Sequence, residues 1–157
     1  MHPDWTEYTV NWIAGDLSIP DGTKIEKAEV EVYYCWDKTP GGNIGDYLKL
    51  KFNGKSKTTE AQYKDSKGSG IYNYPSGMIE YDVTADFNTG GNTAVLKNAY
   101  PGGGKVSIDG MLLTVVYQDA SELMRHIWVN KEYDIIYAKE DYGVSSEEAT
   151  AYAPFHD

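Results

Sequence analysis

The chain has 157 residues, of which 41% are hydrophobic and 24% are charged, and its formal net charge is −10. This length and composition predict one globular domain over residues 1–157 and argue against an intrinsically disordered chain. An acidic surface repels phosphate backbones, which argues against nucleic acid as a partner, and no apolar run approaches the ~18 residues of a membrane-spanning helix.

The first half of the chain alternates apolar and polar residues with the period of a β-strand. In residues 28–36 the apolar set lies on one parity and includes Trp36, so we expect this strand to bury one face and Trp36 to join the core. Asn53-Gly54 is a strong hairpin signal. The strands expected here are residues 8–14, 28–36, 47–52 and 57–63.

The second half contains a strand of a different kind, because residues 107–117 are apolar on both parities. That pattern predicts a central strand that is covered on both faces. Ser145 and Glu148 fit a capping box that only a turn of helix could follow. Further strands are expected at 79–83, 93–97, 127–129, 133–138 and 149–155, with a helical turn at 120–125 and short edge strands at 93–97 and 149–153.

Nine or ten short strands at regular spacing, without a long helix, predict an all-β fold. Two packed antiparallel sheets bury such strands most simply, and loops of varied length favour a sandwich over a closed barrel. The predicted fold is therefore an antiparallel two-sheet β-sandwich, jelly-roll-like, with little helix.

Several segments, taken in order, resemble a domain of unknown function found in cell-surface proteins of methanogenic archaea, which are associated with surface layers and sheaths. The match opens with residues 17–36, LSIPDGTKIEKAEVEVYYCW. It continues through residues 50–54, 72–77, 81–84, 110–117 and 147–150.

The resemblance implies an exported protein located outside the cell or in its envelope, with this domain excised from a longer precursor. It implies a structural or interaction module of a surface layer, sheath or adhesin, with other envelope chains as partners. The resemblance supplies no catalytic residues, and we expect no enzymatic activity and no obligatory cofactor.

Aromatic residues in loops leave a second function open, because flat ring faces can dock sugars. Tyr72, Tyr74, Trp128 and Tyr142 fall in loops or off the apolar parity, and Tyr72-Asn73-Tyr74 precedes Pro75. They predict a platform for an extracellular glycan, and so a carbohydrate-binding module. Rings that merely close the ends of the sandwich are the alternative interpretation.

Two carboxylate patterns also need interpretation. Asp37, Asn43 and Asp46 flank a glycine-containing loop and could bind calcium, although such residues also favour turns by bonding their own backbone. Glu29 and Glu31 are two residues apart on one strand, and so are Glu80 and Asp82, roughly 6.5–7 Å, a spacing found in inverting glycosidases. Because any strand gives this spacing on its polar face, we expect both pairs to face solvent.

Overall fold

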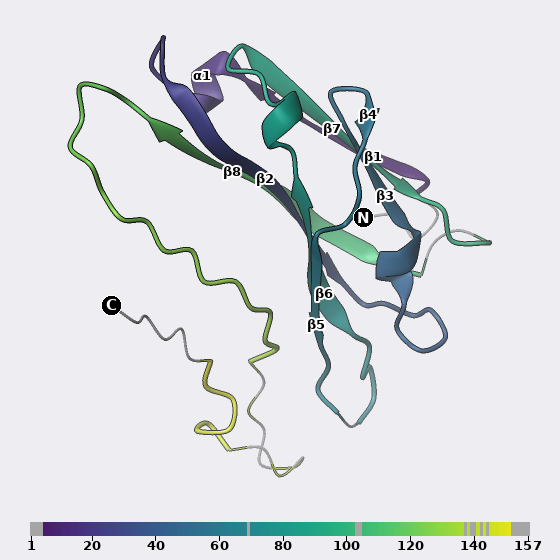
Figure 1. The fold of residues 1–157 in the computed structure, drawn as a ribbon. Coiled ribbons are helices and arrows are strands. Elements are labelled where there is room, and N and C mark those ends of the chain that lie inside the picture. Colours follow the sequence, from purple (N-terminus) through teal and green to yellow (C-terminus); the bar gives the residue numbers. More distant parts are fainter. Residues whose placement is uncertain are drawn as a thin grey trace.

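The computed structural model describes residues 5–68, 70–102, 105–136, 138, 141, 143 and 145–151, which form two four-stranded antiparallel sheets (Figure 1). Sheet A has the order β1 (Glu7–Ile13), β7 (Gly91–Asn98), β3 (Leu48–Phe52) and β4 (Lys55–Ser56). Sheet B has the order β5 (Ala61–Asp65), β6 (Ser76–Asp82), β2 (Lys24–Cys35) and β8 (Ser107–Gln118). The helical elements are the short α1 (Ala14–Leu17), η1 (Ile44–Tyr47) and η2 (Thr84–Asp86).

The prediction of an all-β, two-sheet sandwich with little helix is confirmed. The chain passes back and forth between the sheets, from β1 in sheet A to β2 in sheet B and back to β3. Within the described part of the chain, no helix is long and apolar enough to cross a bilayer.

The core lies between the sheets and follows the period-two pattern of the sequence. In β2, Ala28, Val30 and Val32 are fully buried against sheet A, where Leu48 and Phe52 of β3 are equally buried. Burying each of the valine, leucine and phenylalanine side chains contributes about 1.5–3 kcal/mol before the cost of ordering the chain is counted. The hydrophobic contact between the inner faces therefore holds the two sheets together.

The Asn53-Gly54 hairpin is confirmed, but its returning strand is β4 (Lys55–Ser56) and not the expected 57–63, whose last residues belong to β5 and pair with β6 in the other sheet. Asn53 and Gly54 have positive φ, 48° and 81°, as a type I′ turn requires, and Lys51 pairs with Ser56 across the two strands.

Two predicted strand positions are wrong. Strand β7, expected at an edge, lies between β1 and β3, whereas β8, expected at the centre, is bonded to β2 alone among the described strands. A bulge explains part of the misleading pattern of β8: Gly110 pairs with Tyr33 but Ile108 pairs with Tyr34, so the inward parity changes there. The core-facing residues are therefore Ile108 before the bulge and Met111, Leu113 and Val115 after it. Leu112 and Val116, in contrast, lie on the outer face, where they pair with Glu31 and Lys27 of β2.

The chain after β8 also departs from expectation. Residues 119–136, here called the arm, include none of the expected strands or helix, although Glu122 N–H closes a turn on the Asp119 carbonyl. Residues 149–151 of the expected last strand are likewise not in a strand. The capping box is confirmed, since the Ser145 and Glu148 amides each donate to the side chain of the other.

Candidate functional site

An aromatic cluster projects from one end of the sandwich, where β2 ends and the β5–β6 loop turns. The rings of Trp36 and Tyr72 stack with centroids 5.7 Å apart and an interplanar angle of 25°. Tyr74 lies 6.2 Å from Trp36, and the Lys38 ammonium lies 5.1 Å from the Trp36 ring centroid. Tyr72 remains 64% exposed and Trp36 48% exposed, so the cluster presents flat ring surface to solvent.

Close contacts between the loop after β2 and the β5–β6 loop hold these rings in place. Asp37 N–H donates to the Pro75 carbonyl at 2.8 Å. Gly42 packs so closely on Pro75 that an added Cβ would lie 2.6 Å from the proline Cγ. The buried Asp37 carboxylate, described below, shapes the first of these loops.

The backbone of the cluster is unusual as well. Trp36 and Tyr72 have φ of 60° and 64°, in the left-handed region that costs an L-residue about 1–2 kcal/mol. Such conformations persist where the surrounding contacts impose them, and they gather at functional sites. The strained positions here carry the two stacked rings.

Of the four residues predicted to form a glycan platform, the structure brings together Tyr72 and Tyr74. Tyr72 and Tyr74 are neighbours, but Trp128 lies on the arm and stacks on His126 at 5.5 Å. Tyr142 lies outside the described residues. Trp36 belongs to the cluster, although its parity in the sequence predicted a place in the core. That prediction is wrong because β2 ends at Cys35 and the alternation no longer applies beyond it.

The calcium prediction concerns the same loop. The Asp37 carboxylate accepts hydrogen bonds from the Thr39 amide at 2.8 Å, the Thr39 hydroxyl at 2.6 Å and the Ile44 amide at 2.9 Å. The side chains of Asn43 and Asp46 are exposed. Because the Asp37 oxygens already have partners in the loop, they act as turn formers, and calcium binding here stays a prediction.

A second assembly of side chains lies on the outer face of sheet B, beneath the end of the arm. Lys131, Tyr133 and Ile135 are half-buried toward the sheet, while Glu132 and Asp134 between them are exposed. The Ile135 amide donates to the Asp65 carboxylate at 2.9 Å, and the Tyr133 ring lies 6.5 Å from that of Tyr33. The arm is therefore fastened to the sheet by alternate side chains, without a backbone ladder.

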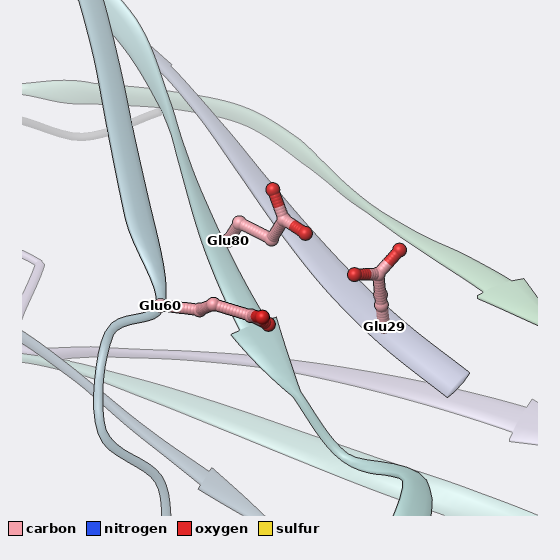
Figure 2. Close-up of side chains that lie close together, drawn as sticks. All are labelled: Glu29, Glu60 and Glu80. Atoms are coloured by element: carbon pink, nitrogen blue, oxygen red, sulfur yellow. The ribbon is translucent and has the colours of Figure 1, made fainter. Parts of the chain in front are cut away.

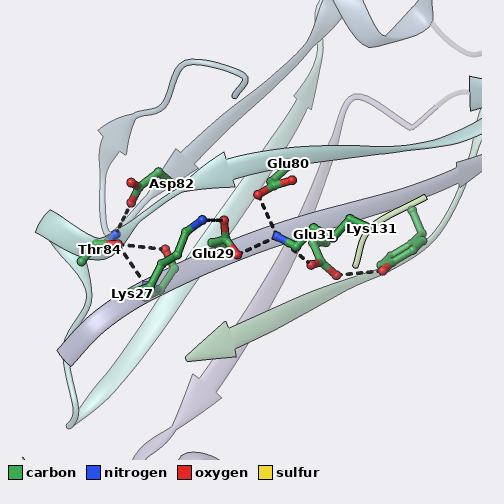
Figure 3. A network of polar contacts seen from close by, with 9 residues as sticks. Lys27, Glu29, Glu31, Glu80, Asp82, Thr84 and Lys131 are labelled. Atoms are coloured by element: carbon green, nitrogen blue, oxygen red, sulfur yellow. Dashed lines mark hydrogen bonds and ion pairs between the residues drawn. The ribbon is translucent and has the colours of Figure 1, made fainter. Parts of the chain in front are cut away.

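Lys131 is the central contact of this attachment (Figure 3). Its ammonium lies 2.6 Å from a Glu29 oxygen, 2.7 Å from Glu80 and 3.3 Å from Glu31. The side chains of Glu29 and Glu31 are 5% exposed and that of Lys131 is 12% exposed. Lys27 pairs with the second Glu29 oxygen. The expectation that Glu29, Glu31 and Glu80 face solvent is wrong, because the arm covers the polar face of β2 and of neighbouring β6; Asp82 is exposed as expected.

Burial and hydrogen bonds within the cluster set the pKa values of its side chains. Burial acts to raise the pKa of Glu29, but hydrogen bonds from Glu80, Lys131 and Lys27 outweigh it and lower the pKa to about 2. Burial and the hydrogen bond to Glu29 raise the pKa of Glu80. Burial would lower the pKa of Lys131, but hydrogen bonds to Glu29, Glu80 and Glu31 raise it. Glu29 therefore stays ionised, and Lys131 stays protonated.

Glu60 adds a further carboxylate at the edge of this cluster (Figure 2). One oxygen from each of Glu29, Glu60 and Glu80 lies within 4.8 Å of the others, close enough to share a metal ion. The Lys131 ammonium, however, already contacts both Glu29 and Glu80. The group is therefore an ion-pair cluster whose cations are lysines.

The fold and its surfaces define the class of protein: an acidic β-sandwich with an exposed aromatic cluster and an extended arm fastened by a buried lysine. The chain belongs to the family described as Protein of unknown function (DUF3344), which matches residues 2–157. No curated protein and no solved structure matches it significantly.

The Lys131→Met substitution tests the ion-pair cluster. Without the ammonium, Glu29, Glu31 and Glu80 repel one another in a buried position, and we expect the free energy of unfolding to fall by about 3 kcal/mol in urea titrations. The carboxyl pKa values then rise in the folded state, so stability should increase as the pH falls from about 7 toward about 5.

The control is Lys24→Met, which removes an exposed pair with Glu26 and should cost less than about 1 kcal/mol. Replacing the three glutamates by glutamine in the Lys131→Met background should restore most of the loss. A Lys131→Met protein as stable as the wild type would contradict the assignment.

Proposed function

We propose that the domain is a non-catalytic structural or interaction module of an archaeal cell envelope, within a surface layer, a sheath or an adhesin. The observation that carries the proposal is the apolar surface of the arm. Its exposed large side chains are Leu123, Met124, Ile127, Trp128, Val129 and Ile136, each at least 51% exposed. A soluble monomer rarely exposes so many large apolar groups together, and such surface is typical of protein interfaces.

Two further features support an interface at the arm. A groove of about 810 Å³ lies between the arm and the end of β8, with Val116, Leu123 and Ile127 among its lining residues. Lys131 attaches the far end of the arm to sheet B. The apolar side chains therefore lie on a segment that is anchored at this end. The resemblance to surface proteins of methanogenic archaea supports the envelope as the location.

The test is fractionation of cells that make the natural protein, combined with a triple variant, Leu123→Ser, Met124→Ser and Ile127→Ser. We expect the wild type in the envelope fraction and release of the variant into the wash, because its apolar contact with neighbouring chains is lost. Ile71→Ser is the matched control, since Ile71 is 73% exposed on the β5–β6 loop and not on the arm. A wild type absent from the envelope, or a triple variant retained as firmly as the wild type, would contradict the proposal.

The aromatic cluster favours a second function, carbohydrate binding. Trp36, Tyr72 and Tyr74 offer adjoining ring faces at the tip of two interlocked loops, and the Lys38 ammonium beside them can donate hydrogen bonds. Sugar rings carry apolar faces that fit such surfaces and hydroxyl groups that fit such donors. The ligand class is an extracellular polysaccharide that reaches the end of the sandwich.

A glycan array followed by affinity electrophoresis tests this second function. Tyr72→Ala should weaken binding about tenfold or more, as loss of a central aromatic contact commonly does, whereas Tyr72→Phe keeps the ring and most of the affinity. Trp128→Ala is the matched control, because Trp128 is 55% exposed on the arm. Absence of binding to any envelope or plant polysaccharide, or equal losses in Tyr72→Ala and Trp128→Ala, would rule the platform out.

A further inference from the structure

The middle of the arm is exposed over a long unbroken stretch. Residues 121–130 are all solvent-exposed, and none of them lies in a helix or a strand. Among the described residues, one hydrogen bond between backbone groups reaches this stretch, from Glu122 N–H to the Asp119 carbonyl near its start. Endoproteases cut such segments preferentially, because they can draw the chain into their cleft without unfolding the rest of the protein.

The arm does not pack closely against the sandwich at this point. The groove of about 810 Å³ described above lies between the arm and the end of β8, with Leu123, Met124 and Arg125 among its lining residues. Leu123 is 82% exposed, Met124 is 89% exposed, and the Arg125 side chain is 74% exposed. A protease can therefore reach this part of the chain without displacing a packed side chain.

Arg125 is the single arginine of the sequence, and it lies in the middle of the exposed stretch. Its ion pair with Glu122 has a distance of 3.8 Å, and the Glu122 side chain is 65% exposed, so water and salt weaken the contact. The guanidinium is therefore available to a protease whose specificity pocket holds a carboxylate. The residue after the arginine is His126, which leaves the following backbone N–H in place, as a proline would not.

We propose that the Arg125–His126 peptide bond is a processing site for an arginine-specific endoprotease, and that the cut leaves a folded domain of two chains. Hydrolysis consumes one water molecule, and it gives Arg125 a carboxylate and His126 an amino group. The strands β1 to β8 all end by Gln118, so the sandwich lies on one side of the cut. The other fragment stays on sheet B, because Lys131 pairs there with the buried glutamates.

The inference goes beyond the proposed function and does not rest on it. Cleavage divides the apolar surface of the arm, leaving Leu123 and Met124 on the first fragment and Ile127 and Trp128 on the second. A neighbouring chain bound to that surface would shield the bond. The site therefore belongs to the unassembled domain.

Digestion of the purified full chain by an arginine-specific endoprotease, followed by mass spectrometry, tests the site. We expect one cut, into residues 1–125 and 126–157, at a rate within about tenfold of that for a synthetic peptide of residues 119–131. A slower rate would overturn the proposal, because a cut that required global unfolding would be at least about a thousandfold slower than that of the peptide.

The matched control moves the arginine while keeping the number of cleavable bonds the same. Arg125→Gln combined with Lys49→Arg places the arginine at an exposed position of β3, where the backbone is paired with β7. This variant should stay intact while the wild type is cut. Cleavage of the variant as fast as the wild type would overturn the assignment of the site to the arm.

Size exclusion of the cleaved protein tests the two-chain product. The two wild-type fragments should elute together in native buffer and separate in urea. In Lys131→Met, checked first for an unchanged circular dichroism spectrum, the 126–157 fragment should dissociate, whereas in Lys24→Met it should stay bound, because Lys24 pairs with Glu26 on the surface. Separation of the wild-type fragments in native buffer, or retention of the fragment in Lys131→Met, would overturn the two-chain product.

Discussion

The Lys131 ammonium is the contact on which the outer surface of sheet B depends. Glu29, Glu31 and Glu80 are nearly inaccessible to solvent, and burial of three carboxylates is costly unless a cation lies among them. Lys131 supplies that cation from a segment about a hundred residues beyond β2 in the sequence, at a hydrogen-bonding distance of 2.6 Å to Glu29. The end of the arm thereby covers part of the outer face of sheet B, and the apolar part of the arm lies beside this covered area.

The sequence predicts the inner faces of the sandwich well, and for a simple reason. Period-two alternation reports which side of a strand meets the core, and residues such as Val30 and Val32 lie where that pattern places them. The Asn53-Gly54 hairpin could be predicted because both residues tolerate positive φ. Local chemistry decides each of these features, so a single sequence is enough.

Features that depend on distant partners could not be predicted in the same way. Glu29 alternates as a solvent-facing residue does, and only the arm, which folds back over β2, buries it. Trp36 is in phase with the core but lies just past the end of β2, where the left-handed backbone turns its ring outward to meet Tyr72. The alternation of Lys131, Tyr133 and Ile135 with acidic residues was the available signal for the arm, although it predicts a paired strand equally well.

Amide hydrogen exchange along the arm tests the central claim most directly. The Ile135 amide donates to the Asp65 carboxylate where the arm is fastened, whereas Leu123 and Met124 lie in the exposed part of the arm. We expect slow exchange at Ile135 and rapid exchange at the other two amides, with the Ile135 protection lost when Lys131 is replaced by methionine. Exchange at Ile135 as fast as at Leu123 in the wild type would contradict the account.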